Sequence, residues 1–496
     1  MRSYLMAHRH RLEELQFDNT YARLPEAFYA RVEPTPLPNP VLVSFNPDAA
    51  ALLDLDPDEA KRPEFAGVFG GQFLIPGSEP VAMLYSGHQF GIYAGQLGDG
   101  RAILLGEVRN GRGEKWDLHL KGAGQTPFSR DGDGRAVLRS TIREYLCGEA
   151  MHGLGIPTTR SLCIVAGDEP VLRERPEVGA MLLRMAPTHV RFGSFQAFFA
   201  RRQPEYVKQL ADHVIARFYP HLAGAADTYP RFFDAVSVRT AQLIAKWQAV
   251  GWAHGVMNSD NMSIIGLTLD YGPYGFLDAY DPSFICNHSD HHGRYSFRNQ
   301  PDIGYFNLRC LGQALSSLVT PQQEQEALAA YEAAHAAHYL ELMRAKLGLQ
   351  KSTSEDGLLI SDLLALMAMN QVDYTIFFRA LGGFKSGAAE TNDSLRDFFT
   401  DRDGFDRWAV RYADRLRAET GRDDDRRARM NQVNPKYILR NHLAQTAIER
   451  AQLKDYSEID RLRQLLKDPF AEQPDMDAYA APPPDWGRQI LVSCSS

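Results

Sequence analysis

Apolar and polar positions alternate in several short runs of the first half of the chain, and glycine turns separate these runs. In residues 116–121 a tryptophan and two leucines fall on every second position, which is the period of a strand that buries one face. The dipeptide Asn110-Gly111 before this run is typical of a hairpin turn. The pattern predicts strands at 101–108, 116–121, 161–166 and 180–185, with a turn at 167–170 opening the segment between the last two.

Helical spacing of apolar residues first appears at 136–151, between the second and third predicted strands, and glycines and a proline end that helix by residue 157. After about residue 195 the pattern is helical almost throughout. The predicted helices there are 204–222, 233–250, 321–347, 358–381, 395–420 and 435–453. The order strand, strand, helix, strand, strand, followed by helices, is typical of a protein kinase.

At 496 residues the chain is too long to fold around one simple hydrophobic core, so two or three packed units are expected. Residues 1–80 are rich in proline and aromatic residues and predict an extension that wraps the core. We predict a small lobe at 81–195, a large lobe at 196–310 and a helical C-terminal region at 311–496. The predicted fold is therefore α+β, bilobal and kinase-like, with an extension at each end.

Composition narrows the class of protein. The hydrophobic content of 44% and charged content of 23% are ordinary for a soluble globular enzyme. A net charge of −8 argues against a general nucleic-acid binder. The sequence has no long apolar run, and its N-terminus is too polar for a secretory signal, so we expect a cytoplasmic protein without a membrane span. Five scattered cysteines match neither a disulfide framework nor zinc-ligand spacing.

The stretch from His254 to Asn261 has the spacing of a kinase catalytic loop, which begins His-x-Asp and ends in a metal-binding Asn. Val256 stands where a kinase keeps its catalytic aspartate, so the base position carries an alkyl group. Asp270 is followed by Tyr-Gly and matches the metal-binding Asp-aromatic-Gly turn. This loop is suited to hold a metal-bound nucleotide but not to perform ordinary transfer of the γ-phosphoryl group.

Asn261 and Asp270 offer hard oxygen ligands of the kind that Mg²⁺ prefers. Their alternative role is to cap turns. Asp260 is the nearest carboxylate that could accept a substrate proton in place of the missing base, and its alternative role is to support a neighbouring ligand. His254 is expected to brace the loop.

Lys121 ends a predicted strand, and Glu144 lies on the helix that follows. A kinase fold pairs such a lysine with such a glutamate and so fixes the ammonium against nucleotide phosphates. The alternative is a solvated strand lysine and an ordinary surface glutamate.

Gly98, Gly100 and Arg101 belong to a glycine-rich turn before the first strand, where backbone N–H groups can approach phosphate closely. Many such turns are only tight turns, and this order is not the kinase Gly-x-Gly-x-x-Gly.

Two further pairs are candidates for phosphate contacts. Arg184 and Arg191 fall where the small and large lobes should join, and arginine forks suit phosphate oxygens. A surface salt bridge is the alternative for Arg191. Asp133 and Gly134 lie at the entry to the Glu144 helix, where they either contact the nucleotide or cap the helix.

Several segments together resemble the selenoprotein O family over nearly the whole chain. They are Phe17–Tyr21, Tyr85–Gly91, Gly95–Arg101, Leu120–Arg130, Met257–Asn261, Asp270–Pro273 and the final Cys-Ser-Ser. The resemblance implies a kinase-like fold that binds ATP in a flipped orientation, with the α-phosphate directed at the acceptor. It implies AMP transfer to Ser, Thr or Tyr hydroxyls of proteins with release of pyrophosphate, and UMP transfer from UTP is also attributed to the family.

By motif position the resemblance implies roles for the residues singled out above. The implied nucleotide contacts are Gly98, Gly100, Arg101, Lys121, Asp133, Gly134, Arg184, Arg191 and Asp270. The implied metal ligands are Asn261 and Asp270, with Mg²⁺ or Mn²⁺ as the metal. Asp260 is implied to be the proton acceptor, and Glu144 the partner of Lys121.

Some relatives carry selenocysteine near the C-terminus, where this chain has Cys494, and a redox pairing with Cys286 is our hypothesis. The expected partners are the nucleotide and protein substrates, without nucleic acid or membrane. Two alternative functions stay open, a kinase with an atypical base and a silent nucleotide-binding scaffold.

Overall fold

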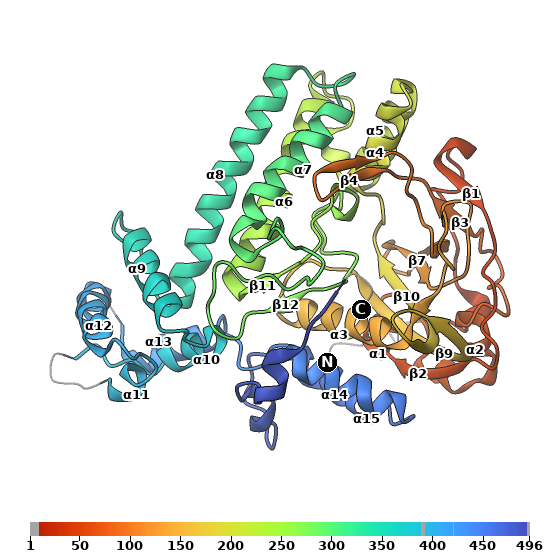
Figure 1. Cartoon of the computed structure of the whole chain (residues 1–496). Helices are drawn as coiled ribbons and strands as arrows, with labels where there is room; N and C mark the ends of the chain where they lie inside the picture. The colour runs from red at the N-terminus through yellow and green to blue at the C-terminus, as the bar shows by residue number, and fades with distance from the viewer. Residues whose placement is uncertain (1–8, 388–391, 420, 494–496) are drawn as a thin grey trace, which may run out of the picture.

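The computed structural model describes residues 9–387, 392–419 and 421–493, which form a mixed α/β fold (Figure 1). One eight-stranded sheet dominates it, with antiparallel neighbours in the order β1-β3-β6-β7-β10-β9-β2 and β8 also paired to β10. Its strands are β1 (Tyr29–Arg31), β2 (Val41–Phe45), β3 (Val81–Met83), β6 (Ala102–Arg109), β7 (Lys115–Lys121), β8 (Ala136–Val137), β9 (Arg160–Leu172) and β10 (Pro176–Ala186). Two small pairs are separate from it, β4 (Gly87–Gln89) with β5 (Ile92–Ala94), and β11 (Trp252–Ala253) with β12 (Gly275–Phe276).

The four predicted strands are confirmed as β6, β7, β9 and β10, and the predicted helix between them is α3 (Leu138–Gly153). The predicted turn at 167–170 is wrong, because β9 continues to Leu172 and pairs with β10 as far as Pro176. Pro170 is tolerated there because β2 reaches β9 only up to Ala166, which leaves this part of β9 on the edge of the sheet.

The first 80 residues supply both outer strands of the sheet, β1 at one end and β2 at the other. Sequence periodicity did not reveal them, because strands of three and five residues are too short to show it. The segment is fastened to β6 by Asn19, whose Oδ1 accepts the Glu107 N–H at 2.9 Å and whose Nδ2 donates to Gly77 O at 2.9 Å. The backbone N–H of Tyr21 in turn donates to Glu107 at 2.6 Å.

The rest of the described chain is mostly helical. Its helices are α1 (Pro47–Ala51), α2 (Pro63–Phe69), α4 (Phe192–Ala200), α5 (Pro204–Phe218), α6 (Thr228–Val250), α7 (Gln300–Ala314), α8 (Pro321–Lys346), α9 (Asp356–Met369), α10 (Tyr374–Leu381), α11 (Asp393–Arg396), α12 (Arg402–Arg417), α13 (Asp423–Asn431), α14 (Asn441–Gln452) and α15 (Ser457–Lys467). None of the described helices is long and apolar enough to cross a membrane.

Two predicted long helices are wrong, because each is broken by a capping aspartate inside an apolar pattern. The segment 358–381 divides into α9 and α10, where Asp373 accepts the Ile376 N–H at 2.9 Å. The segment 395–420 divides into α11 and α12, where Asp401 accepts the Gly404 N–H at 2.8 Å. Each cap satisfies a backbone donor that the first turn of a helix leaves free.

Helix α14 begins at Asn441 rather than at 435, because the preceding residues are held by tertiary contacts. Arg440, which is 2% exposed, forms ion pairs with Asp278 and Asp373.

Apolar side chains cover both faces of the sheet. On one face Ile103, Leu118 and Leu120 pack in a cluster with residues of α1 and α2. On the other face Leu104 and Leu182 belong to a larger cluster that includes α3 and helices α4 to α8. Lys121 of β7 and Arg184 of β10 share the face of Leu104 and Leu182 and therefore lie between the sheet and the helical part of the molecule.

Replacement of Asn19 by Ala tests the attachment of the first segment. Because Asn19 is buried and N19A leaves the Glu107 N–H and Gly77 C=O without partners, we expect a loss of about 1–3 kcal/mol in the free energy of unfolding. Urea unfolding of N19A and of the nearby exposed control Q16A gives the measurement. Equal stability of the two variants would contradict this assignment.

Candidate active site

A cleft opens where the ends of β7 and β10 face the segment 256–273. Its inner part, of about 400 Å³, is lined by Lys121, Arg184, Asn261 and Asp270, among others. Its outer part, of about 640 Å³, is lined by residues of the glycine-rich turn and the loop before α3, including Gly98, Asp133, Gly134 and Asp260. Both parts share Tyr85, Gln89, Gly100 and Arg101 and form one continuous site.

Lys121 and Glu144 are in direct contact at the back of the cleft. The strand alternation places Lys121 on the face of β7 that looks toward α3, and its Nζ donates to a carboxylate oxygen of Glu144. Both side chains are buried, so the alternative of a surface lysine and glutamate is wrong. Burial lowers the pKa of Lys121, while the Glu144 carboxylate opposes that shift.

Asp270 forms ion pairs with two arginines. Its backbone has a left-handed φ of +57°, and its two carboxylate oxygens accept N–H groups from Arg184 and Arg191. Although burial opposes ionisation, Arg191 and Arg184 hold the pKa of Asp270 well below its usual range. Arg191 is 2% exposed, so its alternative role in a surface salt bridge is wrong. Of the site residues that the sequence predicted, Glu144 and Arg191 do not line the cleft and lie behind its wall.

Arg184 is itself positioned by His119 and Asp99, which sequence reasoning did not select. Arg184 Nη2 donates to His119 Nδ1 at 2.7 Å, and His119 Nε2 lies 2.9 Å from Asp99 Oδ2. Burial lowers the pKa of His119 to about 4, so the imidazole is neutral at pH 7 and its N–H is on Nε2. The sequence did contain a signal for His119, because it lies two residues before Lys121 and therefore on the same polar face of β7.

Asp260 lies under the β4–β5 hairpin and is 5% exposed. Its Oδ2 accepts from Gln89 at 3.3 Å, and its Oδ1 has no hydrogen-bond partner in the described part of the chain. Burial raises the pKa of Asp260 to about 6. Gly87 allows the close approach of the hairpin, because a Cβ there would lie 2.4 Å from Asp260 Oδ1. Asp260 is therefore a shielded carboxylate, with Oδ1 buried against Gly87 and Oδ2 turned toward Gln89.

Hydrogen bonds within the catalytic-loop segment stabilise its conformation. His254 is buried, and its Nε2 donates to Leu269 O at 3.1 Å while its Nδ1 accepts the Val256 N–H at 3.3 Å. Asn261 Nδ2 donates to Val256 O at 3.0 Å, which leaves Asn261 Oδ1 as a possible metal ligand. Each Asp270 oxygen retains lone pairs beyond those used by the arginines. Asn261 and Asp270 line the same cavity, so their oxygens fit a hard divalent cation.

A reciprocal pair of bonds joins α3 to the loop that carries Asp270. Arg143 Nη2 donates to Tyr274 O at 3.0 Å, and Tyr274 Oη donates to Arg143 O at 2.8 Å. The guanidinium also lies 4.4 Å from the Tyr274 ring centre. The helix that positions Glu144 is thereby fixed to the turn that positions Asp270, a link that sequence spacing did not indicate.

The glycine-rich and pre-helix residues lie at the outer part of the cleft. Asp133 accepts the Arg135 N–H at 2.8 Å and pairs with Arg173, so it stabilises its own loop. It does not cap α3, whose N-cap residue is Val137.

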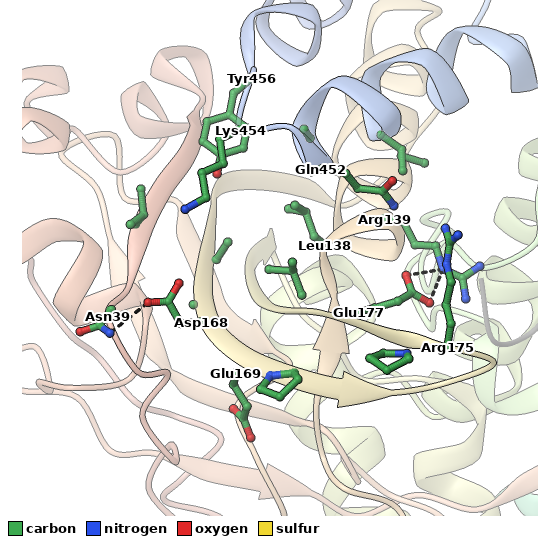
Figure 2. Close-up of a pocket in the computed structure, with 18 residues that line it drawn as sticks. Asn39, Leu138, Arg139, Asp168, Glu169, Arg175, Glu177, Gln452, Lys454 and Tyr456 are labelled. Carbon is green, nitrogen blue, oxygen red and sulfur yellow. Dashed lines mark hydrogen bonds and ion pairs between the residues drawn. The ribbon is translucent and has the colours of Figure 1, made fainter.

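A larger cavity, of about 730 Å³, lies away from these residues, between the β9–β10 hairpin and the segment 448–456 (Figure 2). Two pairs of its polar side chains are joined to each other, Arg139 with Glu177 and Asn39 with Asp168. Its lining also includes a lysine, arginines, amides and carboxylates, but no residue of the catalytic-loop motif or of the Lys121–Glu144 pair. Size alone therefore does not identify the active site here.

The cleft combines a buried Lys–Glu pair with an arginine-held aspartate, and the chain's relatives define its class. The family model "Protein adenylyltransferase SelO" matches residues 11–467, and the chain belongs to this family. The expected resemblance to the selenoprotein O family is thus confirmed.

Curated relatives match over almost their full length. A "Protein nucleotidyltransferase YdiU" from Myxococcus xanthus is 61% identical over 485 residues, covering 98% of this chain and 99% of the relative. Proteins of the same name from Thiobacillus denitrificans and Thioalkalivibrio sulfidiphilus are 58% and 57% identical, with 98% of this chain and 99% and 100% of each relative covered.

The hypothesis that Cys286 pairs with Cys494 falls partly outside the described residues, because Cys494 is not among them. The described end of the tail does reach this region. The backbone N–H of His288 donates to Val492 O at 2.7 Å.

The neutral state of His119 predicts a pH dependence of stability. Its pKa is lower in the folded protein than in the unfolded chain, so the unfolded chain binds a proton first as the pH falls below about 6.5. The stability that depends on neutral His119 is complete above that pH and declines toward pH 4. Between pH 6.5 and 5, we expect wild type to lose about 1–2 kcal/mol more than H119N.

Urea unfolding of metal-free protein at both pH values measures this difference. In H119N the amide oxygen can still accept from Arg184 but does not titrate, and H221N controls for loss of an exposed histidine. Parallel losses in wild type and H119N would refute the neutral assignment.

Proposed function

We propose that this chain transfers AMP from ATP to hydroxyl groups of protein Ser, Thr or Tyr side chains and releases pyrophosphate. The names of its family and its full-length relatives support a nucleotidyltransferase. The observation that carries the proposal is Asp260, a buried carboxylate with an unpartnered oxygen beside the Asn261–Asp270 pair, in a loop where Val256 replaces the kinase base.

We further propose that the fold is kinase-like and bilobal, with a small lobe at 81–195 and a large lobe at 196–310. The order β6, β7, α3, β9, β10 and the Lys121–Glu144 contact support this arrangement. Residues 1–80 would then be an extension that completes the sheet, and 311–496 a helical addition. The two lobes would be packed against each other through the apolar cluster that spans α3 and α4 to α8.

The nucleotide would occupy both parts of the cleft. Lys121 and Arg184 line the inner part and would meet phosphate oxygens there, with Arg191 next to them. Gly98, Gly100 and Arg101 would contact the nucleotide from the glycine-rich turn, and Asp133 and Gly134 from the loop before α3. A flipped nucleotide would place its terminal phosphates on Arg184, with Arg191 behind it, and leave the α-phosphorus toward Asp260. UTP would be an alternative donor.

Asn261 and Asp270 would hold Mg²⁺ or Mn²⁺. The metal would neutralise charge on the phosphates and the departing pyrophosphate. Without ligands, Arg184 and Arg191 balance the charge of Asp270. The same N–H groups can donate to phosphate oxygens, since arginine forks match both anions.

The chain's own residues provide the remaining parts of the reaction. An acceptor hydroxyl would lose its proton to the Asp260 carboxylate as its oxygen attacks the α-phosphorus and the bond to pyrophosphate breaks. Gln89 would orient Asp260 through Oδ2. Lys121, fixed by Glu144, would stabilise negative charge that grows on the leaving group.

Radiolabelled ATP distinguishes the reaction from its alternatives. With protein acceptors present, we expect label from the α-phosphate to become attached to protein, and label from the γ-phosphate to leave as pyrophosphate. Protein labelled from the γ-phosphate would indicate a kinase. Nucleotide binding without any transfer would indicate a silent scaffold.

Asp260 to Asn tests the proposed proton acceptor. The amide keeps the shape of the carboxylate but cannot accept the proton, so we expect the transfer rate to fall by about 10²-fold or more with little change in nucleotide affinity. Rates with α-labelled ATP, together with calorimetric nucleotide binding, separate these effects. The control D212N removes an exposed carboxylate that pairs only with neighbours on the surface. Undiminished transfer by D260N would remove Asp260 from the mechanism.

A further inference from the structure

A lysine-lined cavity lies apart from the proposed active site, at the C-terminal ends of α3, α6 and α8. It has a volume of about 310 Å³ and includes Lys246 and Lys346 in its lining. Most of the other side chains facing it are apolar, including Leu154, Ile156, Val250, Leu342, Val433 and Phe470. The described residues that line it include no aspartate or glutamate.

Lys346 is the unusual member of this lining. It is only 5% exposed, and no hydrogen bond or ion pair joins its ammonium to any residue within the described ranges. Two rings of α10 lie beside its Nζ, with centres 4.3 Å away for Phe378 and 5.1 Å away for Tyr374. Cation–π contacts stabilise the charge by about 0.5–2 kcal/mol but leave all three N–H donors without an oxygen acceptor.

The position of Lys346 on α8 directs it to the cavity. Leu342, Ala345 and Lys346 are spaced three and four residues apart, so they share one helix face, and all three line the cavity. The Tyr374 hydroxyl donates to Ala249 O at 2.9 Å, and Ala249 is also part of the lining. Lys346 is thus part of the cavity wall, and its Nζ lies close to two rings of α10 that are outside the lining.

Lys246 differs from Lys346 because one of its three N–H donors is already used. Its Nζ donates to Gly155 O at 3.0 Å, at the side of the cavity formed by the end of α3. The lining therefore holds two lysines without a carboxylate beside them, and only Lys346 has no oxygen acceptor for any of its N–H groups among the described residues. That combination is complementary to a single negative charge on a short hydrocarbon, since an anion would complete the hydrogen bonds of Lys346 and the tail would displace water from the apolar wall.

We infer that the lysine-lined cavity is a binding site for a small apolar monocarboxylate, whose carboxylate pairs with Lys346. A phosphate monoester fits less well, because it is usually bound by arginine forks or successive backbone N–H groups, and the described lining includes no arginine. The volume lies at the lower end of the range for small-molecule sites, about 300–1,000 Å³. The inference is independent of the proposed AMP transfer.

Calorimetry with sodium hexanoate on the full-length protein tests this site. We expect saturable binding to wild type, binding at least tenfold weaker for acetate, which lacks the tail, and at least tenfold weaker for hexanol, which lacks the charge. In K346M the side chain keeps its length but loses the ammonium, so hexanoate affinity should fall at least tenfold. The control K208M removes an exposed lysine and should bind as wild type does.

A second measurement does not depend on the folding of a variant. With [ε-¹³C]lysine in wild-type protein, hexanoate should shift the Lys346 resonance and raise the pH at which it titrates, because the carboxylate stabilises the ammonium. Equal hexanoate affinity in K346M, equal affinity for hexanol, or an unchanged Lys346 resonance at saturating hexanoate would overturn the inference. So would the absence of saturable hexanoate binding.

Discussion

The carboxylate of Asp270, held between Arg184 and Arg191, is the interaction on which the rest of the site depends. Arg184 comes from β10, and Arg191 immediately precedes α4, so the two ion pairs attach the Asp270 loop to both the sheet and the helices. All three groups are removed from bulk water to a large extent. Removing Asp270 would take this carboxylate from two buried guanidinium groups, and breaking a buried ion pair typically costs about 3–5 kcal/mol.

Several buried contacts surround these ion pairs and hold the neighbouring charged side chains in place. His119 and Asp99 orient Arg184, while Glu144 contacts both Lys121 and Arg184. Arg143 and Tyr274 then connect the Glu144 helix to the Asp270 loop. Because each charged group has a defined partner, the cleft presents its polar atoms in fixed positions rather than as mobile surface side chains.

The alkyl group of Val256 at the kinase base position is best interpreted together with the nearby carboxylate of Asp260. Four residues apart in a short loop, one position carries an alkyl group and the other a buried carboxylate with an unpartnered oxygen. If Asp260 is the proton acceptor, as we propose, its displacement from the kinase base position suits attack on a different phosphorus atom of the nucleotide. That is the physical basis for assigning nucleotidyl transfer rather than phosphoryl transfer to this cleft, and membership of the adenylyltransferase family supports it.

The sequence by itself determined the local elements and the chemical types of the site residues. Alternation placed His119 and Lys121 on one strand face, and loop spacing selected Asn261 and Asp270, because periodicity and motif spacing are local properties of the chain. Contacts between distant segments could not be determined in this way. Only the tertiary structure decided that β1 and β2 form opposite edges of the sheet, that Asp373 divides a predicted helix, and that Arg191 lies behind Asp270. These depend on which surfaces meet when the chain packs, and neither hydrophobic period nor residue type encodes such long-range pairing.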